Sequence, residues 1–175
     1  MKGYAHSTFS NCTSLESVSS FPYVIELSGT FSNCYSLKSV DFPNATAVYD
    51  SAFYNCTNLS SVSFPKASRV GGNTFSQCTN LTTVSFPSVT ELRNYAFDGC
   101  TNLQTLEIGP DIRSISYDIC HNCPNLTVVC FTGISVPANL KSSFGNENTV
   151  YYRSADCPDF DWKEFTGKTG VYPDD

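Results

Sequence analysis

The side chains in this sequence that are best suited to chemistry are nine cysteines, two histidines and a group of carboxylates near the C-terminus. Cys120 and Cys123 form a Cys-x-x-Cys pair, the spacing that zinc sites and redox enzymes use. A structural zinc site usually needs two such pairs, and a redox pair needs the start of a helix in a βαβ unit. The sequence offers neither context. We therefore predict that both cysteines pack inward and bind no metal.

Catalytic machinery is also missing from the sequence. Histidine occurs only at His6 and His121, and neither belongs to a pattern with a nucleophile, a base and a third group that orients the base. The acidic stretch 156–164 lacks the glycine and glutamate spacing of an EF-hand, which favours a solvated loop over a calcium site. The sequence therefore predicts no catalytic residues, no cofactor and no metal, and we do not expect an enzyme.

Length and charge narrow the class of protein further. The chain has 175 residues, enough for one domain with a substantial core. Its formal charge is -6 with only 15% charged residues, and no basic cluster fits nucleic acid. No apolar run approaches the ~18 residues of a membrane helix, and the first residues lack the apolar stretch of a signal peptide. We expect no nucleic-acid partner and no membrane insertion by this chain.

A repeat of 22 residues organises most of the chain. A phenylalanine lies three residues before each of the first five repeat cysteines, and a leucine lies three residues after every one. A Val or Leu, a Phe or Ile and a proline then follow in step, and a weaker apolar pair such as Val89 and Leu92 completes each unit. The spacings are 22, 22, 22, 22 and 23 residues between the repeat cysteines, which are Cys12, Cys34, Cys56, Cys78, Cys100 and Cys123.

This period predicts an α/β repeat solenoid of about six coils with short parallel β-strands. The Leu-x-x-Val-x-Phe-Pro segment, as in 37–43, is typical of a strand that proline ends by removing a ladder donor. Residues 22 apart then stack, so successive strands lie parallel and about 4.8 Å apart. The Ala-Phe-x-x-Cys segment, as in 52–56, is predicted to form a single helical turn on the opposite wall. Six stacked coils make the continuous core that one coil cannot make alone.

The repeat unit resembles the BspA-like leucine-rich repeats over roughly residues 4 to 133. Segments 55–65 and 94–103 carry the likeness, because their Cys, Leu, Pro and Ala-Phe positions agree together. The sixth coil departs from the pattern at Ile119, Cys120 and Pro124. The resemblance implies a bacterial or protozoan surface or secreted protein that binds host matrix proteins or other cells, and it supplies no catalytic residues.

The six repeat cysteines are predicted to form a structural column of buried, reduced thiols. Their side chains run parallel, whereas a disulfide needs Cβ atoms about 3.5–4.5 Å apart. A thiol in this column can also donate weakly to a loop carbonyl. Cys130 differs, because strand alternation between Val129 and Phe131 turns it outward. A single disulfide between Cys130 and Cys157 stays open as an alternative to two free thiols.

Two surfaces are candidates for binding. The outward positions of the Leu-x-x-Val-x-Phe strands form a flat, hydroxyl-rich and nearly uncharged face, which either docks a partner or consists of soluble filler residues. Tyrosines outside the inward columns offer a second, lateral aromatic patch at Tyr49, Tyr95 and Tyr117. The candidate binding face comprises Ser17, Ser19, Ser39, Asp41, Ser61, Ser63, Thr83, Ser85, Thr105 and Glu107.

The ends of the array divide the chain into repeats over 1–133 and a C-terminal capping segment over 134–175. The second segment breaks the period and carries Phe160, Trp162 and Phe165, bulky side chains that can seal the last coil. The N-terminus begins mid-coil and shows no comparable cap. We expect the chain to be a piece of a longer surface protein. Its oligomeric state is predicted to be either a monomer or a dimer joined end to end through the open N-terminal coil.

The leading functional prediction is a non-enzymatic, adhesin-like module of the cell surface with a protein or glycan ligand. The alternative is a structural spacer or an intracellular scaffold for protein interactions. The cell-surface or secreted location follows from the family resemblance alone.

Overall fold

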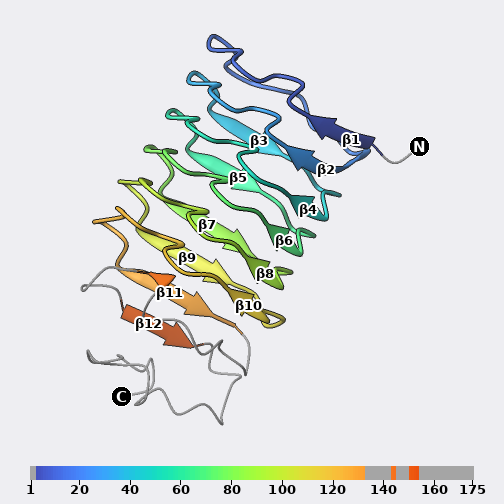
Figure 1. Ribbon diagram of the computed structural model, residues 1–175. Coiled ribbons are helices and arrows are strands. Elements are labelled where there is room, and N and C mark those ends of the chain that lie inside the picture. Colours follow the sequence, from blue (N-terminus) through green and yellow to red (C-terminus); the bar gives the residue numbers. More distant parts are fainter. Residues whose placement is uncertain (1–2, 133–142, 145–149, 154–175) are drawn as a thin grey trace.

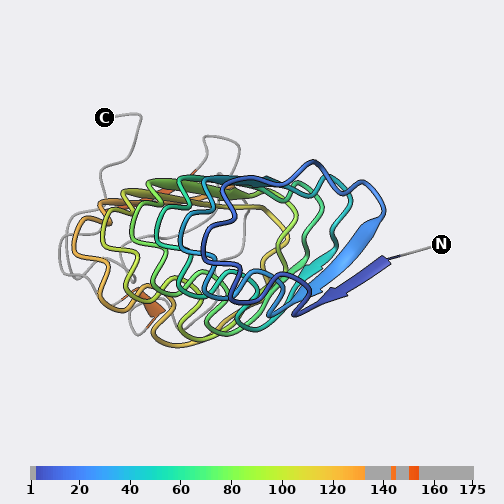
Figure 2. The ribbon, with the colours of Figure 1, turned by 90° about the horizontal axis from the view of Figure 1, so that it is seen from above.

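The protein is a parallel β-solenoid, seen in a computed structural model that describes residues 3–132, 143–144 and 150–153. Figure 1 shows the coils stacked from the N-terminal end, with strands on two walls from the second coil onward. Figure 2 shows the same coils from above, each offset slightly from the one before. The repeat spacing and the parallel stacking predicted from the sequence are confirmed.

The first wall is built from the Leu-x-x-Val-x-Phe segments, as predicted. Its strands pair in parallel as β3–β5 and as β7–β9–β11–β12. The register is one repeat, so that Val40 lies opposite Val62 and Val84 opposite Leu106. We call this wall the first sheet; its strands are β3 (Ser39–Asp41), β5 (Ser61–Ser63), β7 (Thr83–Phe86), β9 (Thr105–Ile108), β11 (Val128–Phe131) and β12 (Val150–Arg153).

A second sheet, which the sequence analysis did not predict, forms from the weaker apolar pair of each coil. It has six parallel strands in the order β1-β2-β4-β6-β8-β10. Four of them are only two residues long, too short for the alternation that reveals a strand in a sequence. The strands of this second sheet are β1 (Gly3–His6), β2 (Val24–Ser28), β4 (Ala47–Val48), β6 (Arg69–Val70), β8 (Glu91–Leu92) and β10 (Ser114–Ile115).

The predicted helical turn is wrong, because residues 3–132 contain no helix. The Ala-Phe-x-x-Cys segments instead form a wall of turns, which we call the turn wall. In each coil two residues of this wall have positive φ: the fifth residue before the cysteine and the residue directly before it. In the third coil these are Ser51 (φ 56°) and Asn55 (φ 60°), and a left-handed residue breaks a right-handed helix. The backbone N–H groups therefore donate to the next coil, as Phe53 does to Thr74 (2.8 Å). The α component of the predicted fold class is not present there.

Two ladders of phenylalanine rings fill the core. Rings of the turn wall stack at 5.2 to 5.4 Å between centroids, with interplanar angles of 10° or less. A second ladder on the first sheet runs beside it at 5.5 to 6.3 Å. Rings of the two ladders tilt toward each other, as Phe53 and Phe64 do at 56°. The inner rings of both ladders are fully buried, so the core is continuous from coil to coil.

The late proline of the fifth coil has a steric reason. Gly109 occupies the position that proline holds in the three coils before it, and the proline is delayed to Pro110. A Cβ atom on Gly109 would overlap the backbone of Pro87 in the neighbouring coil. Glycine is therefore required where these two backbones approach.

The repeat continues beyond residue 133 in the fragments that the structure describes. The N–H of Cys120 donates to Ser143 (3.3 Å), which is the inter-coil bond of the turn wall. Phe144 is buried against Phe131 at 6.4 Å, and β12 pairs with β11 in the one-repeat register. These fragments add two walls of a seventh coil. The predicted cap residues Phe160, Trp162 and Phe165 lie outside the described residues, as does the acidic stretch 156–164.

Because the ladders carry the core, we predict that Phe53→Ala destabilises the fold by about 3–5 kcal/mol, the usual cost of a deleted buried ring. Phe9→Ala is the matched control, since Phe9 is only half-buried and has one ladder neighbour at 5.2 Å. Its cost should be smaller. Urea unfolding followed by circular dichroism measures both, and equal losses would contradict a core that depends on ring stacking.

Candidate functional site

The predicted binding residues lie on the outer side of the first sheet and of the first coil beside it. Seven of them are exposed and three, Ser85, Thr105 and Glu107, are half-buried. In the middle strands the inward Val and Phe side chains alternate with them, as β7 shows with Val84 and Phe86 buried. Ser17 and Ser19 are exposed but precede any strand of this sheet. The described part of the chain thus assembles one continuous small polar face, although binding by these residues stays a prediction.

The hydroxyl groups of this face are not used by the protein itself. Within residues 3–132, Ser39, Ser61 and Thr83 form no side-chain hydrogen bond, and the same holds for the other Ser and Thr side chains predicted to bind. Hydroxyls elsewhere donate to the coil before them, as Thr90 does to the carbonyl of Ser68 (2.9 Å) and Ser88 to that of Pro65 (2.8 Å). The face therefore keeps its full capacity to donate and accept hydrogen bonds.

Charge on this face is sparse and partly cancelled. Glu16 and Lys38, at its edge, form an ion pair of 2.7 Å between neighbouring coils. The hydrogen bond from Lys38 lowers the pKa of the Glu16 carboxyl, and the ammonium charge adds to the effect. Asp41 and Glu107 are the carboxylates that remain among the predicted residues. The face therefore offers hydrogen-bonding groups and shape to a ligand more than it offers charge.

The outer side of the second sheet, unlike that of the first, carries several charged side chains. Glu91 of β8 lies between two arginines, with its carboxylate 2.9 Å from Nε of Arg93 and 3.6 Å from Nε of Arg69. The pair of Arg69 and Glu91 joins neighbouring strands, whereas Arg93 pairs with Glu91 within one coil. Sequence reasoning missed this face because it missed the sheet, and the alternation of Arg and Glu one repeat apart was the available signal.

The predicted aromatic patch is divided by the structure. Tyr95 and Tyr117 meet edge to face at 6.0 Å, and Tyr117 is 56% exposed. Tyr49 is half-buried two coils away, and within the described residues it makes no ring contact with the other two. Partial desolvation raises the pKa of the Tyr95 phenol, and its neighbour Asp118, at 3.4 Å, raises it further. Only the pair Tyr95 and Tyr117 forms a lateral patch.

Beside this pair lies a polar cluster that sequence reasoning did not find. The Asp98 carboxylate contacts Nδ1 of His121 at 2.9 Å and accepts from the Asn122 amide at 3.1 Å and the Gln77 amide at 3.3 Å. These residues replace the asparagine ladder of the first coils, where Asn33 donates to Asn11 at 3.0 Å. The loss of Asn before Cys78 and Cys100 was the sequence signal. Because these groups form hydrogen bonds with one another, we interpret the cluster as a structural link between coils.

The cysteine column lies in the core from the second coil onward. Each thiol donates to the carbonyl of the phenylalanine in the preceding coil, as Cys56 does to Phe31 at 3.1 Å. The same carbonyl accepts the N–H of Cys34 at 3.0 Å, so both of its lone pairs are used. Cys12 differs because no described coil precedes it, and its thiol is exposed. All eight cysteines in the described ranges are free.

Burial suppresses the chemistry of these thiols. Desolvation raises the pKa of Cys34 to about 11 and that of Cys56 to about 12. It raises the pKa of Cys78, Cys100 and Cys120 well above the usual range. A thiol must lose its proton to act as a nucleophile or a metal ligand, so burial keeps these five thiols unreactive.

The structure also places the Cys-x-x-Cys pair and Cys130. Cys120 and Cys123 are both buried, and Cys123 donates to the carbonyl of Phe97 at 3.0 Å. Among the described residues no group of three or more His, Cys, Asp and Glu side chains is placed to hold a metal ion. Cys130 is half-buried on the outer side of β11, and desolvation followed by the charge of Glu107 raises its pKa. Its predicted partner Cys157 lies outside the described residues.

These features define the class of the protein as a leucine-rich repeat solenoid. The chain belongs to the BspA-type leucine-rich repeat family, whose six-copy repeat region matches residues 3–69 and 27–150. Proteins built from this repeat are typically non-enzymatic. No curated protein matches the sequence. In the part of the chain that the structure covers, no helix is long and apolar enough to cross a membrane.

Solved structures of bacterial leucine-rich repeat proteins share the fold. A protein from Bacteroides ovatus is 26% identical with a TM-score of 0.73, over 85% of this chain and 39% of its own. A leucine-rich repeat protein of T. pallidum is 21% identical with a TM-score of 0.68, over 78% of this chain and 68% of its own. The pneumococcal vaccine antigen PcpA is 21% identical with a TM-score of 0.67, over 81% and 37%. This chain therefore spans about two fifths of the first and third of these proteins.

The buried thiols predict a loss of stability in alkaline solution. An unfolded cysteine ionises above about pH 8.5, whereas Cys78 stays protonated in the folded protein. A group with a raised folded pKa contributes full stability below its unfolded pKa and loses it as the pH rises. Between pH 9 and 11 each such thiol should lower the free energy of unfolding by about 1.4 kcal/mol per pH unit.

Urea unfolding at several pH values checks this effect. Cys78→Ala should reduce the slope of the free energy of unfolding against pH by the contribution of one thiol, about 1.4 kcal/mol per pH unit. This change in slope is expected whatever the substitution does to stability at pH 7. Val89→Ala, which removes part of a buried side chain without a titratable group, should leave the slope unchanged. The same slope in wild type and Cys78→Ala would contradict the assignment.

Proposed function

We propose that this protein is a non-enzymatic, adhesin-like binding module of the cell surface that recognises a protein or glycan through the outer face of the first sheet. The observation that carries the proposal is the row of hydroxyls, at residues such as Ser61, Ser63 and Thr83, that form no hydrogen bond with any other residue that the structure describes. The family supports the surface location, because BspA-like proteins are expected there from the resemblance described above.

The geometry of the face indicates the chemistry of the ligand. Parallel strands place equivalent hydroxyls about 4.8 Å apart along the solenoid, with a second row two residues further along each strand. An extended peptide or a glycan chain presents polar groups at comparable intervals along its length. Such a ligand gains many modest hydrogen bonds, each contributing about 0.5–1.5 kcal/mol, and no single dominant ion pair.

A second docking area on the same molecule is the pair Tyr95 and Tyr117. Its support is the exposed ring of Tyr117 in edge contact with Tyr95, since tyrosine supplies contact area and one hydroxyl at protein interfaces. It lies on the turn wall, away from the first sheet, so the two areas can be tested separately.

The test is binding of the chain to panels of host matrix proteins and glycans. The double variant Ser61→Lys, Ser63→Lys places two long charged side chains on β5 and should weaken binding at least ten-fold, about 1.4 kcal/mol. Ser114→Lys is the matched control, an exposed serine on β10 of the second sheet. Its affinity should stay within two-fold of wild type. Biolayer interferometry with the best ligand of the panel measures all three.

Other outcomes would overturn parts of the proposal. Loss of binding in Tyr95→Ala, Tyr117→Ala with normal binding in the β5 variant would move the site to the turn wall. No specific binding at micromolar concentration would contradict the adhesin-like function and favour a spacer or an intracellular scaffold.

A further inference from the structure

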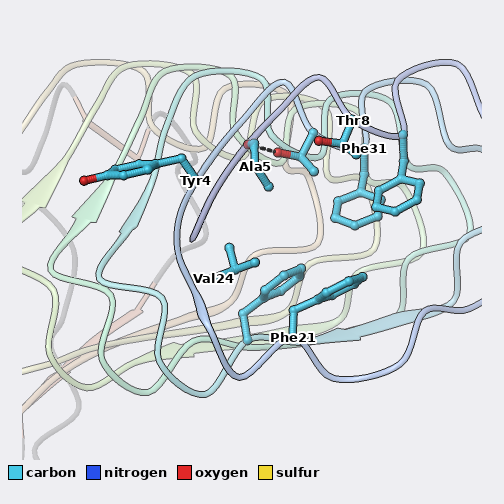
Figure 3. Close-up of a pocket in the computed structure, with 9 residues that line it drawn as sticks. Tyr4, Ala5, Thr8, Phe21, Val24 and Phe31 are labelled. Carbon is cyan, nitrogen blue, oxygen red and sulfur yellow. Dashed lines mark hydrogen bonds between the residues drawn. The ribbon is translucent and has the colours of Figure 1, made fainter. Parts of the chain in front are cut away.

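The cavity at the first coil offers a ligand little to recognise. It measures about 220 Å³, and Figure 3 shows Phe21 and Phe31 on two sides of it. Its lining carries no charged side chain, and the hydroxyl of Thr30 already donates to the carbonyl of Ala5. Aromatic and charged groups gather instead on the turn wall of the fifth and sixth coils, around Tyr95.

Tyr95 is an unusual residue for its position. The fifth residue before the cysteine has positive φ in each of the six coils, and in the other five it is glycine or a short polar residue: Ser7, Gly29, Ser51, Asn73 and Asp118. A bulky side chain in this left-handed conformation is an outlier, and such outliers are concentrated at functional sites. Since the other coils make the same turn without a large side chain, Tyr95 points to a role of its ring outside the turn itself.

The ring of Tyr95 packs against two other rings at nearly right angles. Its centroid lies 6.0 Å from that of Tyr117, at 89°, and 6.3 Å from that of His121, at 82°. Tyr117 is 56% exposed, and it is the one exposed tyrosine in the described ranges that contacts a second tyrosine ring. We call these three rings the aromatic corner. The faces of aromatic rings attract cations.

Two carboxylates accompany the aromatic corner. The N–H of Tyr95 donates to the carbonyl of Asp118 (3.2 Å), and its hydroxyl donates to the carboxylate of the same residue (3.4 Å). The carboxylate of Asp98 lies 2.9 Å from Nδ1 of His121. Within residues 3–132 no lysine or arginine forms an ion pair with either carboxylate. When His121 is neutral, two negative charges therefore remain uncompensated beside the rings.

The hydrogen-bond donors of this site are largely used. The Asn122 amide donates to the Asp98 carboxylate at 3.1 Å, and the Tyr95 hydroxyl donates to Asp118. The contact between Asp98 and Nδ1 of His121 requires the proton on Nδ1, so the neutral imidazole presents the lone pair of Nε2. What remains for a ligand is ring surface, a carboxylate and an acceptor nitrogen. A sugar hydroxyl both donates and accepts, whereas a guanidinium has five N–H donors and no acceptor.

We propose that the aromatic corner binds an arginine side chain of a partner protein, with the guanidinium against the exposed ring of Tyr117 and its N–H groups directed to the Asp118 carboxylate. Guanidinium is planar, so it stacks on aromatic rings and also pairs with carboxylates through two parallel N–H groups. The formal charge of -6 on the chain also favours a basic partner. This assignment rests on the proposed function, whose second docking area is the pair Tyr95 and Tyr117.

An NMR titration of the isotopically labelled 175-residue chain with acetylarginine amide tests the proposal. The backbone amide signals of residues 117–122 should shift and saturate, with a Kd in the millimolar range. Acetylcitrulline amide has nearly the same shape without the charge, and it should bind at least ten-fold more weakly. Asp118→Asn and Tyr117→Ala should each weaken binding of the arginine probe at least five-fold. Asparagine accepts the positive φ of residue 118, so the first variant keeps the turn.

The matched controls are Asp111→Asn and Tyr54→Ala. Asp111 is an exposed carboxylate that precedes β10, and Tyr54 is an exposed tyrosine on the turn wall of the third coil. Both variants should bind the arginine probe within two-fold of wild type. Equal affinity for the arginine and citrulline probes, or unchanged affinity in Asp118→Asn, would overturn the proposal. A glycan whose binding is abolished by Tyr117→Ala would overturn it as well.

The variant Ser61→Lys, Ser63→Lys distinguishes a failure of this proposal from a failure of the proposed function. It changes the first sheet alone, so it should bind the arginine probe as wild type does. If the arginine probe does not bind while a ligand of the panel binds the first sheet, the assignment of the aromatic corner is wrong. If the probe binds while no ligand of the panel does, the proposed binding face is wrong and the aromatic corner stands.

Discussion

Ring stacking along the solenoid axis is the interaction on which the other features depend. The turn-wall rings repeat at 5.2 to 5.4 Å, slightly more than the spacing of paired strands. On this wall the stacked rings and the backbone hydrogen bonds between coils, such as that from Phe53 to Thr74 (2.8 Å), act together to set how closely the coils approach. The carbonyl of each ladder phenylalanine also accepts the thiol of the next coil, as Phe53 does from Cys78 at 3.2 Å. Moving one ring would disturb the cysteine column with it.

Sequence periodicity predicted the parts of the fold that face inward. Val40, Val62 and Val84 recur at a fixed step because each must fill the same space, and this constraint leaves a direct trace in the residue types. The same reasoning placed the outward serines between them. The second sheet left a weaker trace, because strands such as β6, Arg69–Val70, contain a single inward residue and no alternation.

The turn wall was mispredicted for a different physical reason. Ala-Phe-x-x-Cys has the spacing of one helical turn, but left-handed residues occur at both of its borders. In the fifth coil one of them is Tyr95, with a φ of 60°, a bulky residue that gives no warning of this conformation. The polar cluster around Asp98 was missed because it joins residues from three coils, and each of its members, taken alone, is an ordinary surface residue.

Many side-chain hydrogen bonds between coils run from one coil to the coil before it, although Gln77 and Tyr95 donate to the coil after their own. The thiols of the cysteine column donate to the coil before them, and so do the hydroxyls of Ser60, Ser68 and Thr90. The backbone N–H groups of the turn wall donate in the other direction, as Phe53 does to Thr74, so neighbouring coils are joined by hydrogen bonds that run both ways. Each inner coil therefore has hydrogen-bond partners on both of its neighbours, so the coils stabilise one another and a single coil could not satisfy its own polar groups.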